Sequence, residues 1–387
     1  MKKILCRAPV LTESGYGVHA RQIARWLLEN NYDVTFQCLN WGDTPWVTNR
    51  DAYDGLIGKI MDRSDFDNKK VYDVTFQLQL PNEFDPKLGH FNIGISALVE
   101  SDKCNPEWIH HCNNMDVMVV PSEFSKNVLL NTGKIETKLL VIPECFSDKI
   151  FTSDKKLELD VTTKYNFLVF GQLTSYDKID KTDRKNTYNT LKWLCETFKN
   201  NKEVGIVLKT NFGRMTKIDK LICTRKIKEI LSKVRKTEFP KVYLLHGLMN
   251  EEDVAALYKN ESIKALVTTT RGEGYGLPIL EAAASGLPVI ATNWSGHLDY
   301  MGKGKFIDLS YTLSPIPKEK VDNKIWISGT QWAEVDEDNF KKRMIKFKEK
   351  PEIPEKWAKD LQIKLKDQYS YKAISSIWNL HFKDLLI

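Results

Sequence analysis

Short apolar runs rich in β-branched residues alternate with longer amphipathic segments along most of the chain. This alternation predicts β-α-β units with parallel strands, because a strand covered by helices on both faces is apolar along its whole length. The runs fall into two series. The expected strands are residues 3–10, 33–39, 71–78, 91–98, 116–121 and 138–143 in the first series, and 165–172, 204–209, 241–246, 263–270 and 288–292 in the second.

A polar, lysine-rich stretch over residues 144–163 separates the two series and predicts a domain boundary. We therefore expect an α/β protein with two Rossmann-like domains, residues 1–155 and residues 156–367. The pattern loosens after Met301. Residues 340–387 then predict a basic helix, an interruption by prolines, and one or two amphipathic helices.

The composition is that of a globular protein with room for two domains: 387 residues, of which 42% are hydrophobic and 28% charged. The first residues enter a strand pattern without an apolar leader, and no apolar run is long enough to span a bilayer. We expect a cytoplasmic protein, with peripheral attachment to a membrane or nucleic acid left open. Seven scattered cysteines form no C-x-x-C pair and predict reduced, buried thiols.

Positive charge is concentrated in residues 202–241, which contain twelve Lys or Arg and four Asp or Glu, although the net charge of the chain is only +6. This segment includes apolar positions near helical spacing, with basic residues on the other side. We expect a packed helix with a solvated basic face, and the alternative is a face that binds a nucleic-acid backbone or an anionic membrane. The apolar positions are Ile218, Leu221, Ile222, Ile227, Ile230, Leu231 and Val234.

Residues 271–292 (RGEGYGLPILEAAASGLPVIAT) carry the most chemical information. They predict a strand end, a glycine loop, a short helix with Pro278 at its first position, a left-handed stop at Gly286, and another strand. Unpaired amides and the positive dipole end at such a helix start attract phosphate. The amides concerned belong to Gly274, Tyr275, Gly276 and Leu277.

Two carboxylates flank these amides. Glu273 precedes them, and Glu281 lies about one turn inside the helix, roughly 5 Å along its axis. Carboxylates repel a bare phosphate but accept hydrogen bonds from hydroxyls. The arrangement predicts a nucleoside-diphosphate sugar, with Glu281 on the ribose, the amides on the diphosphate and Glu273 on the transferred sugar.

This segment resembles the E-x7-E motif of the retaining family-4 glycosyltransferases, including the Gly-aromatic-Gly-Leu-Pro core and the Gly-x-Pro-Val-Ile strand entry. The resemblance implies a GT-B fold, in which two Rossmann-like domains face a central cleft and a terminal helix, here residues 368–387, completes the first domain. It also implies transfer of a hexosyl or pentosyl group with retention of configuration, without a metal or a cofactor; the nucleotide-sugar is a co-substrate.

A glycine-rich turn also follows the first expected strand (TESGYG, residues 12–17). Gly15 and Gly17 allow the backbone to pass close to a ligand. In the resembled family this first loop faces the donor diphosphate and the acceptor, so Tyr16 and His19 are acceptor candidates, although the loop is also compatible with a simple tight turn.

Arg184 and Lys185 stand ahead of a helical segment after the strand at 165–172 and match the Arg-Lys pair of the resembled family. They supply fixed positive charge for a diphosphate. The chain departs from the family pattern at Gln172, where Arg is common, at Asn186, where Gly is common, and in a longer loop over residues 175–182.

Glu100 follows another strand end and is a candidate to accept a proton or a hydrogen bond from the acceptor. His110 and His111 have no partner at metal-ligand spacing, and we expect no catalytic metal.

These observations predict a glycosyltransferase; the alternative is an inactive module that binds a nucleotide-sugar. The acceptor is left open among a glycan or lipid, a protein and a hydroxylated base in DNA. The donor base and sugar, the linkage and the oligomeric state also remain open.

Overall fold

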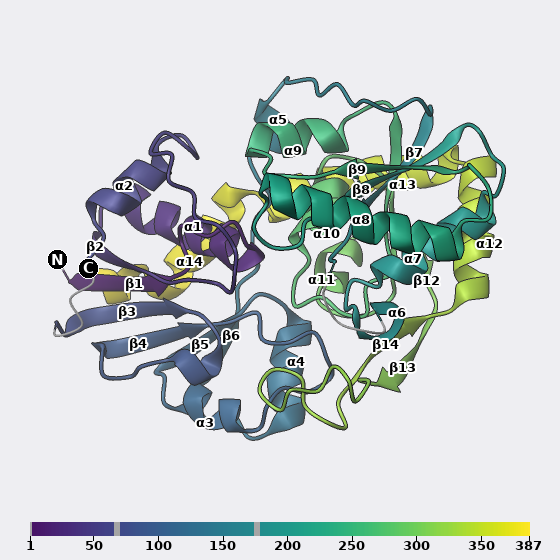
Figure 1. Cartoon of the computed structure of the whole chain (residues 1–387). Helices are drawn as coiled ribbons and strands as arrows, with labels where there is room; N and C mark the ends of the chain where they lie inside the picture. Colours follow the sequence, from purple (N-terminus) through teal and green to yellow (C-terminus); the bar gives the residue numbers. More distant parts are fainter. Residues whose placement is uncertain (1, 66–69, 174–178) are drawn as a thin grey trace. The chain divides into compact units, whose positions relative to one another are not determined.

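The computed structural model describes residues 2–65, 70–173 and 179–387. It divides into two compact units, each built on a parallel sheet with helices on both faces (Figure 1). The first unit comprises Met1–Cys145, Asp322–Ile327 and Tyr369–Ile387; the second comprises Phe146–Val321 and Ser328–Gln368. Among the helices described, none combines the length and the apolar character needed to cross a bilayer.

The first sheet has the order β2-β1-β3-β4-β5-β6, and all its pairings are parallel. Each strand of the first expected series is present. The strands are β1 (Lys3–Ala8), β2 (Asp33–Cys38), β3 (Tyr72–Leu78), β4 (Gly89–Ile95), β5 (Val117–Val120) and β6 (Lys138–Val141).

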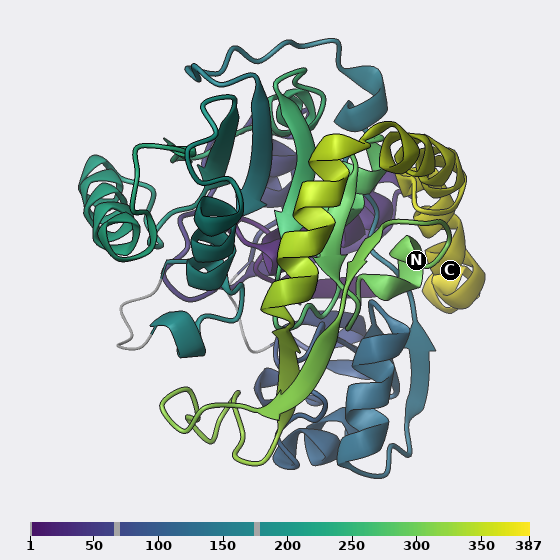
Figure 2. The same cartoon turned by 90° about the vertical axis from the view of Figure 1, so that its right-hand side faces the viewer.

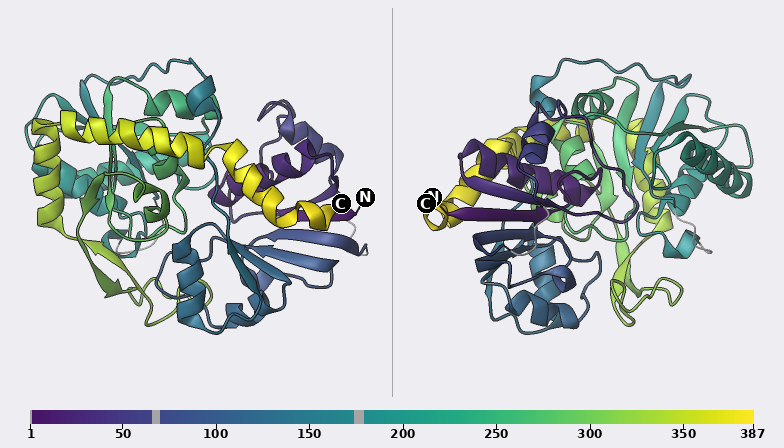
Figure 3. Two further views of the ribbon diagram at one scale, coloured as in Figure 1. Left: turned by 180° about the vertical axis from the view of Figure 1, so that it is seen from behind. Right: turned by 60° about the vertical axis from the view of Figure 1, so that its left-hand side comes forward.

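Helices α1 (Gly15–Glu29), α2 (Leu56–Asp62) and α14 (Tyr371–Leu386) share one hydrophobic core with the first sheet. The ring centroid of Trp378 on α14 lies 5.4 Å from that of Trp26 and 6.2 Å from that of Phe76. The last helix therefore fills the core of the unit that contains the first strand, and Figure 3 shows α14 along that sheet. Helices α3 (Glu107–Asn113) and α4 (Glu123–Thr132) cover the other face, and η1 (Pro81–Glu83) follows β3.

The second sheet has the order β12-β11-β10-β7-β8-β9, again parallel. The second expected series is confirmed, whereas a short edge strand and an antiparallel pair after residue 301 were not foreseen. The strands are β7 (Tyr165–Phe170), β8 (Val204–Lys209), β9 (Lys241–Leu245), β10 (Ile263–Thr268), β11 (Val289–Thr292), β12 (Ile307–Leu309), β13 (Tyr311–Pro315) and β14 (Gln331–Val335).

Helices α7 (Thr187–Thr197), α8 (Lys217–Val234) and α12 (Glu337–Glu349) pack into one core with the second sheet, and Figure 2 shows α12 across its face. The remaining helices of this unit are α5 (Lys149–Thr152), α6 (Ile179–Thr182), α9 (Glu251–Tyr258), α10 (Leu277–Ala284), α11 (Leu298–Met301) and α13 (Glu352–Gln368). Only one of the two late prolines interrupts a helix. Pro351 separates α12 from α13, but Pro354 lies in the first turn of α13, where no intrahelical N–H is required.

The units divide at Cys145/Phe146, ten residues before the expected boundary at 155/156. The reason is that α5 packs on α9 of the second unit. The Ser147 hydroxyl donates to the Glu251 carboxylate (2.6 Å), and the Lys155 ammonium lies 2.7 Å from the Asp253 carboxylate. The segment Asp322–Ile327, inside a loop of the second series, belongs to the first unit, where Asn105 donates to the Lys324 carbonyl (3.1 Å).

Helix α8 is rotated relative to the expected one. Its buried stripe consists of Asp219, Cys223, Ile227, Ile230 and Val234. The apolar residues of its first turns point outward instead, since the exposed fractions of Ile218, Leu221 and Ile222 are 70%, 70% and 38%. The expectation that these three residues pack inside was wrong.

Candidate active site

The sheet order brings Arg184, Lys185 and Glu273 together. Strands β7 and β10 are parallel neighbours, so the loops after their carboxyl ends meet at one edge of the sheet. The Arg271 amide donates to the Arg184 carbonyl (2.8 Å), which ties the two loops to each other. Residues 88 or 89 positions apart in sequence therefore share one site.

Glu273 forms ion pairs with both basic side chains. Its Oε1 lies 2.6 Å from Lys185 Nζ and its Oε2 lies 3.2 Å from Arg184 Nη1. Only 5% of Glu273 is exposed. Burial alone raises the carboxyl pKa, but Lys185 and Arg184 outweigh it and lower the pKa of Glu273 to about 2. Glu273 is therefore ionised throughout the physiological range and neutralises part of the basic pair.

The loop after β11 supports the backbone of Glu273. The Ser295 hydroxyl accepts from the Glu273 amide (2.9 Å), and the Gly296 amide donates to the Glu273 carbonyl (2.9 Å). A Cβ on Gly296 would lie 2.1 Å from the Gly274 carbonyl oxygen, so only glycine permits this approach. Buried His297 contacts the Ser295 hydroxyl (3.4 Å) and the Thr292 carbonyl (2.7 Å). Sequence reasoning missed this supporting loop, because nothing in its spacing indicates contact with residue 273.

The start of α10 has no side-chain cap. Its cap residue is Gly276, with φ of +92° and no side chain to accept a hydrogen bond. The helix begins at Leu277, so Pro278 occupies the second helical position rather than the expected first. The Tyr300 hydroxyl donates to the carbonyls of Tyr275 (3.1 Å) and Gly276 (2.7 Å), which fixes the turn from its carbonyl side.

The Tyr275 side chain belongs to the core. It is 3% exposed, and its ring contacts Tyr300 at a centroid distance of 5.3 Å. Only the backbone of residue 275 is therefore suited to the anion-binding role expected for residues 274–277. Gly286 has φ of +79° and ends the helical segment as expected.

Glu281 occupies a different environment from Glu273. The Tyr258 hydroxyl donates to its Oε2 (3.3 Å), and the Ser147 backbone amide contributes a further hydrogen bond. Burial, followed by repulsion from Glu251, raises the pKa of Glu281 to about 7. One carboxylate of the expected pair is held charged, and the other titrates near neutrality.

Asn186 replaces a glycine of the resembled motif without changing the turn. It has φ of +54° and ψ of 34°, the left-handed conformation that Asn tolerates better than most residues. The Asp183 carboxylate accepts from the amides of Lys185 (2.9 Å) and Thr187 (2.6 Å) and so caps α7. The Arg-Lys pair is thus presented from an ordered turn.

Arg271 stabilises the loop before α7 through buried hydrogen bonds. It is 2% exposed and makes two hydrogen bonds to the Glu334 carboxylate on β14 (2.6 and 3.1 Å). It also donates to the carbonyls of Asp180 (2.8 Å) and Asp183 (2.6 Å). Its role is to position the loop that carries Arg184 and Lys185. Gln172 is exposed, and part of the expected longer loop at 175–182 lies outside the described residues.

In the first glycine turn, which lies in the first unit, a side chain of the turn itself caps the following helix. Ser14 caps α1 by accepting from the Gly17 amide (2.9 Å). A Cβ on Gly17 would lie 2.0 Å from the Thr12 carbonyl oxygen, whereas one on Gly15 would meet nothing within 4 Å. The close approach that requires glycine at 17 is therefore to the chain itself.

Tyr16, His19 and Glu100 all belong to the first unit, and Tyr16 and His19 are both on α1. The Tyr16 hydroxyl lies 3.1 Å from the Ser96 hydroxyl and accepts from the Ala97 amide (3.1 Å), and its ring stacks on Trp41. Burial, opposed by the hydrogen bond to Ser96 and reinforced by the Glu100 carboxylate, raises the pKa of Tyr16.

His19 is 4% exposed. Its Nδ1 lies 3.8 Å from the Glu144 carboxylate, and its Nε2 has no hydrogen-bond partner among the described residues. Burial lowers the pKa of His19 to about 3, so this imidazole is neutral at physiological pH.

All seven cysteines are buried and free of disulfides, as the scattered spacing predicts. His110 and His111 contact each other on α3, and neither falls within a cluster of potential metal ligands among the described residues.

Comparison with known proteins places this site in context. Residues 227–362, which include the glycine loop, α10 and Glu273, match the family model described as glycosyl transferases group 1. Compared by sequence with curated proteins, the chain has no match.

Solved structures resemble the whole chain. Anabaena Alr3699/HepE in complex with UDP and glucose has a TM-score of 0.68 at 12% identity, covering 99% of this chain and 100% of that one. The sucrose-phosphate synthase of Thermosynechococcus elongatus has a TM-score of 0.66 at 12% identity, covering 100% and 99%. A glycosyltransferase from Rickettsia africae also has a TM-score of 0.66, at 13% identity, covering 99% and 98%. The chain therefore has the fold of GT-B glycosyltransferases, and its residues 227–362 are similar to the glycosyl transferases group 1 family.

Proposed function

We propose that the protein transfers a sugar from a nucleoside-diphosphate sugar to an acceptor hydroxyl. One observation carries this proposal: Arg184 and Lys185 meet Glu273 beside the uncapped start of α10. Two cations and a helix start favour a diphosphate, and a buried carboxylate among them favours the hydroxyls of a sugar.

Negative charge grows on the diphosphate as it leaves the anomeric carbon. In the proposed mechanism, Arg184, Lys185 and the amides of residues 274–277 stabilise this charge, which is the main electrostatic contribution to the rate. Glu273 binds the transferred sugar and offsets the positive charge that develops on its ring. In this mechanism, Arg184 and Lys185 exchange their contacts with Glu273 for contacts with the donor diphosphate. The Glu273 carboxylate can then accept hydrogen bonds from the sugar.

The resemblance of the E-x7-E segment extends the proposal to retention of configuration, independence from a catalytic metal, and transfer of a hexosyl or pentosyl group. Glu281 is proposed to bind the ribose. At pH 7 its carboxyl group is present in both protonation states, so it can accept or donate a hydrogen bond to a ribose hydroxyl. We assign no covalent nucleophile.

The direct test measures release of nucleoside diphosphate from a panel of labelled nucleotide-sugars, each offered together with a pool of glycan, lipid, protein and DNA acceptors. UDP-glucose is the first donor to try, because Anabaena Alr3699/HepE was also solved in complex with it. Wild type should turn over at least one donor, and Glu273→Gln should slow release by about 100-fold or more. Glu196→Gln is the matched control, because Glu196 pairs with Lys341 away from the glycine loop. Donor binding by wild type without release with any donor and acceptor pool would instead identify a nucleotide-sugar-binding module.

Tyr16, His19 and Glu100 are the proposed acceptor residues of the first unit. A neutral imidazole and a phenol suit hydrogen bonds to an uncharged hydroxyl group. Glycan or lipid, protein and hydroxylated DNA acceptors are distinguished by offering each class to the active enzyme and following which one becomes labelled.

We propose further that the enzyme works at an anionic membrane surface, to which α8 attaches it. Ile218, Leu221 and Ile222 form an exposed aliphatic cluster on the first turns of this helix. The neighbouring Lys217, Lys220, Arg225 and Lys228 are also exposed. Apolar side chains among basic ones suit insertion at a charged lipid interface, whereas a nucleic-acid backbone offers nothing to the aliphatic cluster.

Flotation with phosphatidylcholine vesicles, with and without phosphatidylglycerol, tests this attachment. Wild type should float only with the anionic vesicles, and the triple variant Ile218→Ser, Leu221→Ser, Ile222→Ser should lose most of that binding. Binding to duplex DNA with a steep salt dependence, undiminished in the triple variant, would favour nucleic acid instead.

A further inference from the structure

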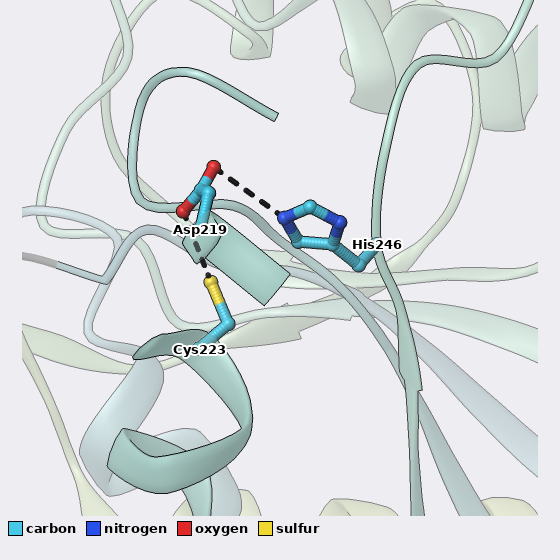
Figure 4. Close-up of side chains that lie close together, drawn as sticks. All are labelled: Asp219, Cys223 and His246. Atoms are coloured by element: carbon cyan, nitrogen blue, oxygen red, sulfur yellow. Dashed lines mark hydrogen bonds and ion pairs between the residues drawn. The ribbon is translucent and has the colours of Figure 1, made fainter. Parts of the chain in front are cut away.

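The buried stripe of α8 begins with polar side chains that meet a histidine from the next strand. Asp219 and Cys223 are one turn apart on α8, and His246 directly follows β9 (Figure 4). One ligand atom from each of the three residues lies within 4.8 Å of the other two. The exposed fractions of the Asp219 and His246 side chains are only 5% and 4%, and Cys223 is fully buried.

One nitrogen of the histidine in this cluster makes no hydrogen bond to the described residues. Its Nε2 is buried and has no hydrogen-bond partner in the described part of the chain; it lies 3.4 Å from an Asp219 carboxylate oxygen, outside hydrogen-bond geometry. A buried polar atom without a partner is costly, and a metal ion is one group that satisfies it. The Cys223 thiol lies 3.6 Å from the other Asp219 oxygen.

The spacing of these atoms suits a four-coordinate ion. Zinc binds histidine nitrogen, carboxylate oxygen and thiolate sulfur at about 2.0 to 2.3 Å, which places neighbouring ligands of a tetrahedron roughly 3.5 Å apart. The His246 nitrogen lies 3.4 Å from one Asp219 oxygen and the Cys223 sulfur lies 3.6 Å from the other, so both separations are of this size and the ion would contact the edge of the Asp219 carboxylate. We propose that Asp219, Cys223 and His246 bind a zinc-type divalent ion, whose fourth position is left for water.

The surrounding chain already orients these groups. The Asp219 carboxylate accepts from the amides of Phe212 (2.8 Å) and Met215 (2.6 Å), which fixes its plane. The Lys209 ammonium donates to the Gly247 carbonyl, which fixes the backbone one residue after His246. Contacts of this kind hold the ligands of metal sites in place. The ion would join the start of α8 to the end of β9, a structural role independent of the proposed sugar transfer.

Binding must release a proton. Burial and the neighbouring Asp219 carboxylate raise the pKa of Cys223 to about 12, so the thiol is protonated before the ion arrives. As the zinc–sulfur bond forms, the S–H bond breaks and one proton passes to the buffer, while an Asp219 oxygen and the His246 nitrogen each contribute a lone pair. No oxidant or reductant takes part.

The test uses the full chain, purified without a histidine tag and stripped with a chelator. Zinc titration against a chromophoric chelator should show one ion per chain, and zinc should raise the melting temperature. Cys223→Ala and His246→Ala should each weaken binding by about 100-fold or more. Cys195→Ala is the matched control, because this buried thiol of the same unit lies outside the cluster and its loss should leave zinc affinity unchanged.

Cobalt provides a second measurement that does not depend on the variants folding equally well. Cobalt-loaded wild type should show thiolate-to-cobalt charge-transfer absorption and the intense visible bands of a four-coordinate ion, and Cys223→Ser should lose the charge-transfer absorption. Absence of stoichiometric zinc binding in wild type, or equal affinities in Cys223→Ala and Cys195→Ala, would overturn the proposal.

Discussion

The two glycine turns of this protein follow the same pattern of strand, glycine loop and helix, but they use the helix start differently. In the first unit, Ser14 caps α1 with its own side chain, and the Gly17 amide is thereby occupied. In the second unit, the cap position of α10 is Gly276, which has no side chain to offer. The difference shows that the cap residue, rather than the number of glycines, decides whether a helix start is available to an anion.

The charged groups near the two turns also differ, and the difference again favours an anion at α10. Around α10, two basic residues and an ionised carboxylate lie together at the loop. Around α1, a phenol and a neutral imidazole lie near the Glu100 and Glu144 carboxylates, and neither Tyr16 nor His19 contributes a positive charge. The first arrangement suits a charged diphosphate and the second suits an uncharged hydroxyl, which is the division of roles proposed above.

Removing positive charge from the second turn should produce the largest effect. Lys185→Met should weaken donor binding by about 10- to 100-fold, because a charge-assisted contact contributes roughly 1.5–3 kcal/mol. Isothermal titration with the donor measures this loss. Lys192→Met is the control, since Lys192 pairs with Glu337 (3.5 Å) on the surface of the same unit; equal losses in both variants would contradict the assignment.

The two carboxylates of the second turn should respond oppositely to pH. The pKa of Glu281 is raised to about 7, so the stability it contributes in its protonated form is lost as pH rises from about 4.5 to 7. The pKa of Glu273 is lowered to about 2, so its contribution is present above about 4.5 and is lost as pH falls through 2.

The unfolding free energy of wild type should therefore fall by about 2 kcal/mol between pH 5 and 8, and Glu281→Gln should not show this fall. Denaturant unfolding of the variant and of wild type at both pH values measures it. An unchanged pH dependence in the variant would show that Glu281 does not titrate in this range.

A glycine-to-alanine substitution in each turn tests whether the backbone there requires glycine. Gly276→Ala should destabilise the protein by about 1–2 kcal/mol, because residue 276 has φ of +92° and the new Cβ would lie 3.0 Å from the Tyr300 hydroxyl. Gly15→Ala should be neutral or stabilise by up to about 1 kcal/mol, because nothing lies within 4 Å. Thermal unfolding of both variants checks the pair, and similar shifts would remove the distinction.

The smallest effect concerns the cap itself. Ser14→Ala should lower the unfolding free energy by about 1 kcal/mol, since the Gly17 amide loses its acceptor. Ser14→Gly should cost only a few tenths of a kcal/mol, as is usual at cap positions. If Ser14→Ala is neutral, the hydroxyl does not serve as a cap in solution.

Much of this architecture follows from the sequence, because apolar strands and glycine turns are local signals. All eleven expected strands are present, and adjacency of β7 and β10 explains why a motif at 184–185 meets one at 273. The supporting contacts of Arg271, Ser295 and Tyr300 could not be read in this way, since each joins loops that are distant in sequence.

The hydrophobic pattern of α8 also could not predict which side of the helix is buried. Ile218, Leu221 and Ile222 have the spacing of a buried face, but the backbone amides of Phe212 and Met215 fix Asp219 on the inside instead. One carboxylate with two specific donors thus sets which side of the helix is buried.

Because α14 completes the core of the first unit, the order of synthesis matters for this protein. The second unit lies entirely within residues 146–368, so all of its core has left the ribosome while the first unit still lacks Trp378 and Phe382. The part of the chain that is made first therefore cannot bury Trp26 and Phe76 against α14 until the whole second unit has been translated.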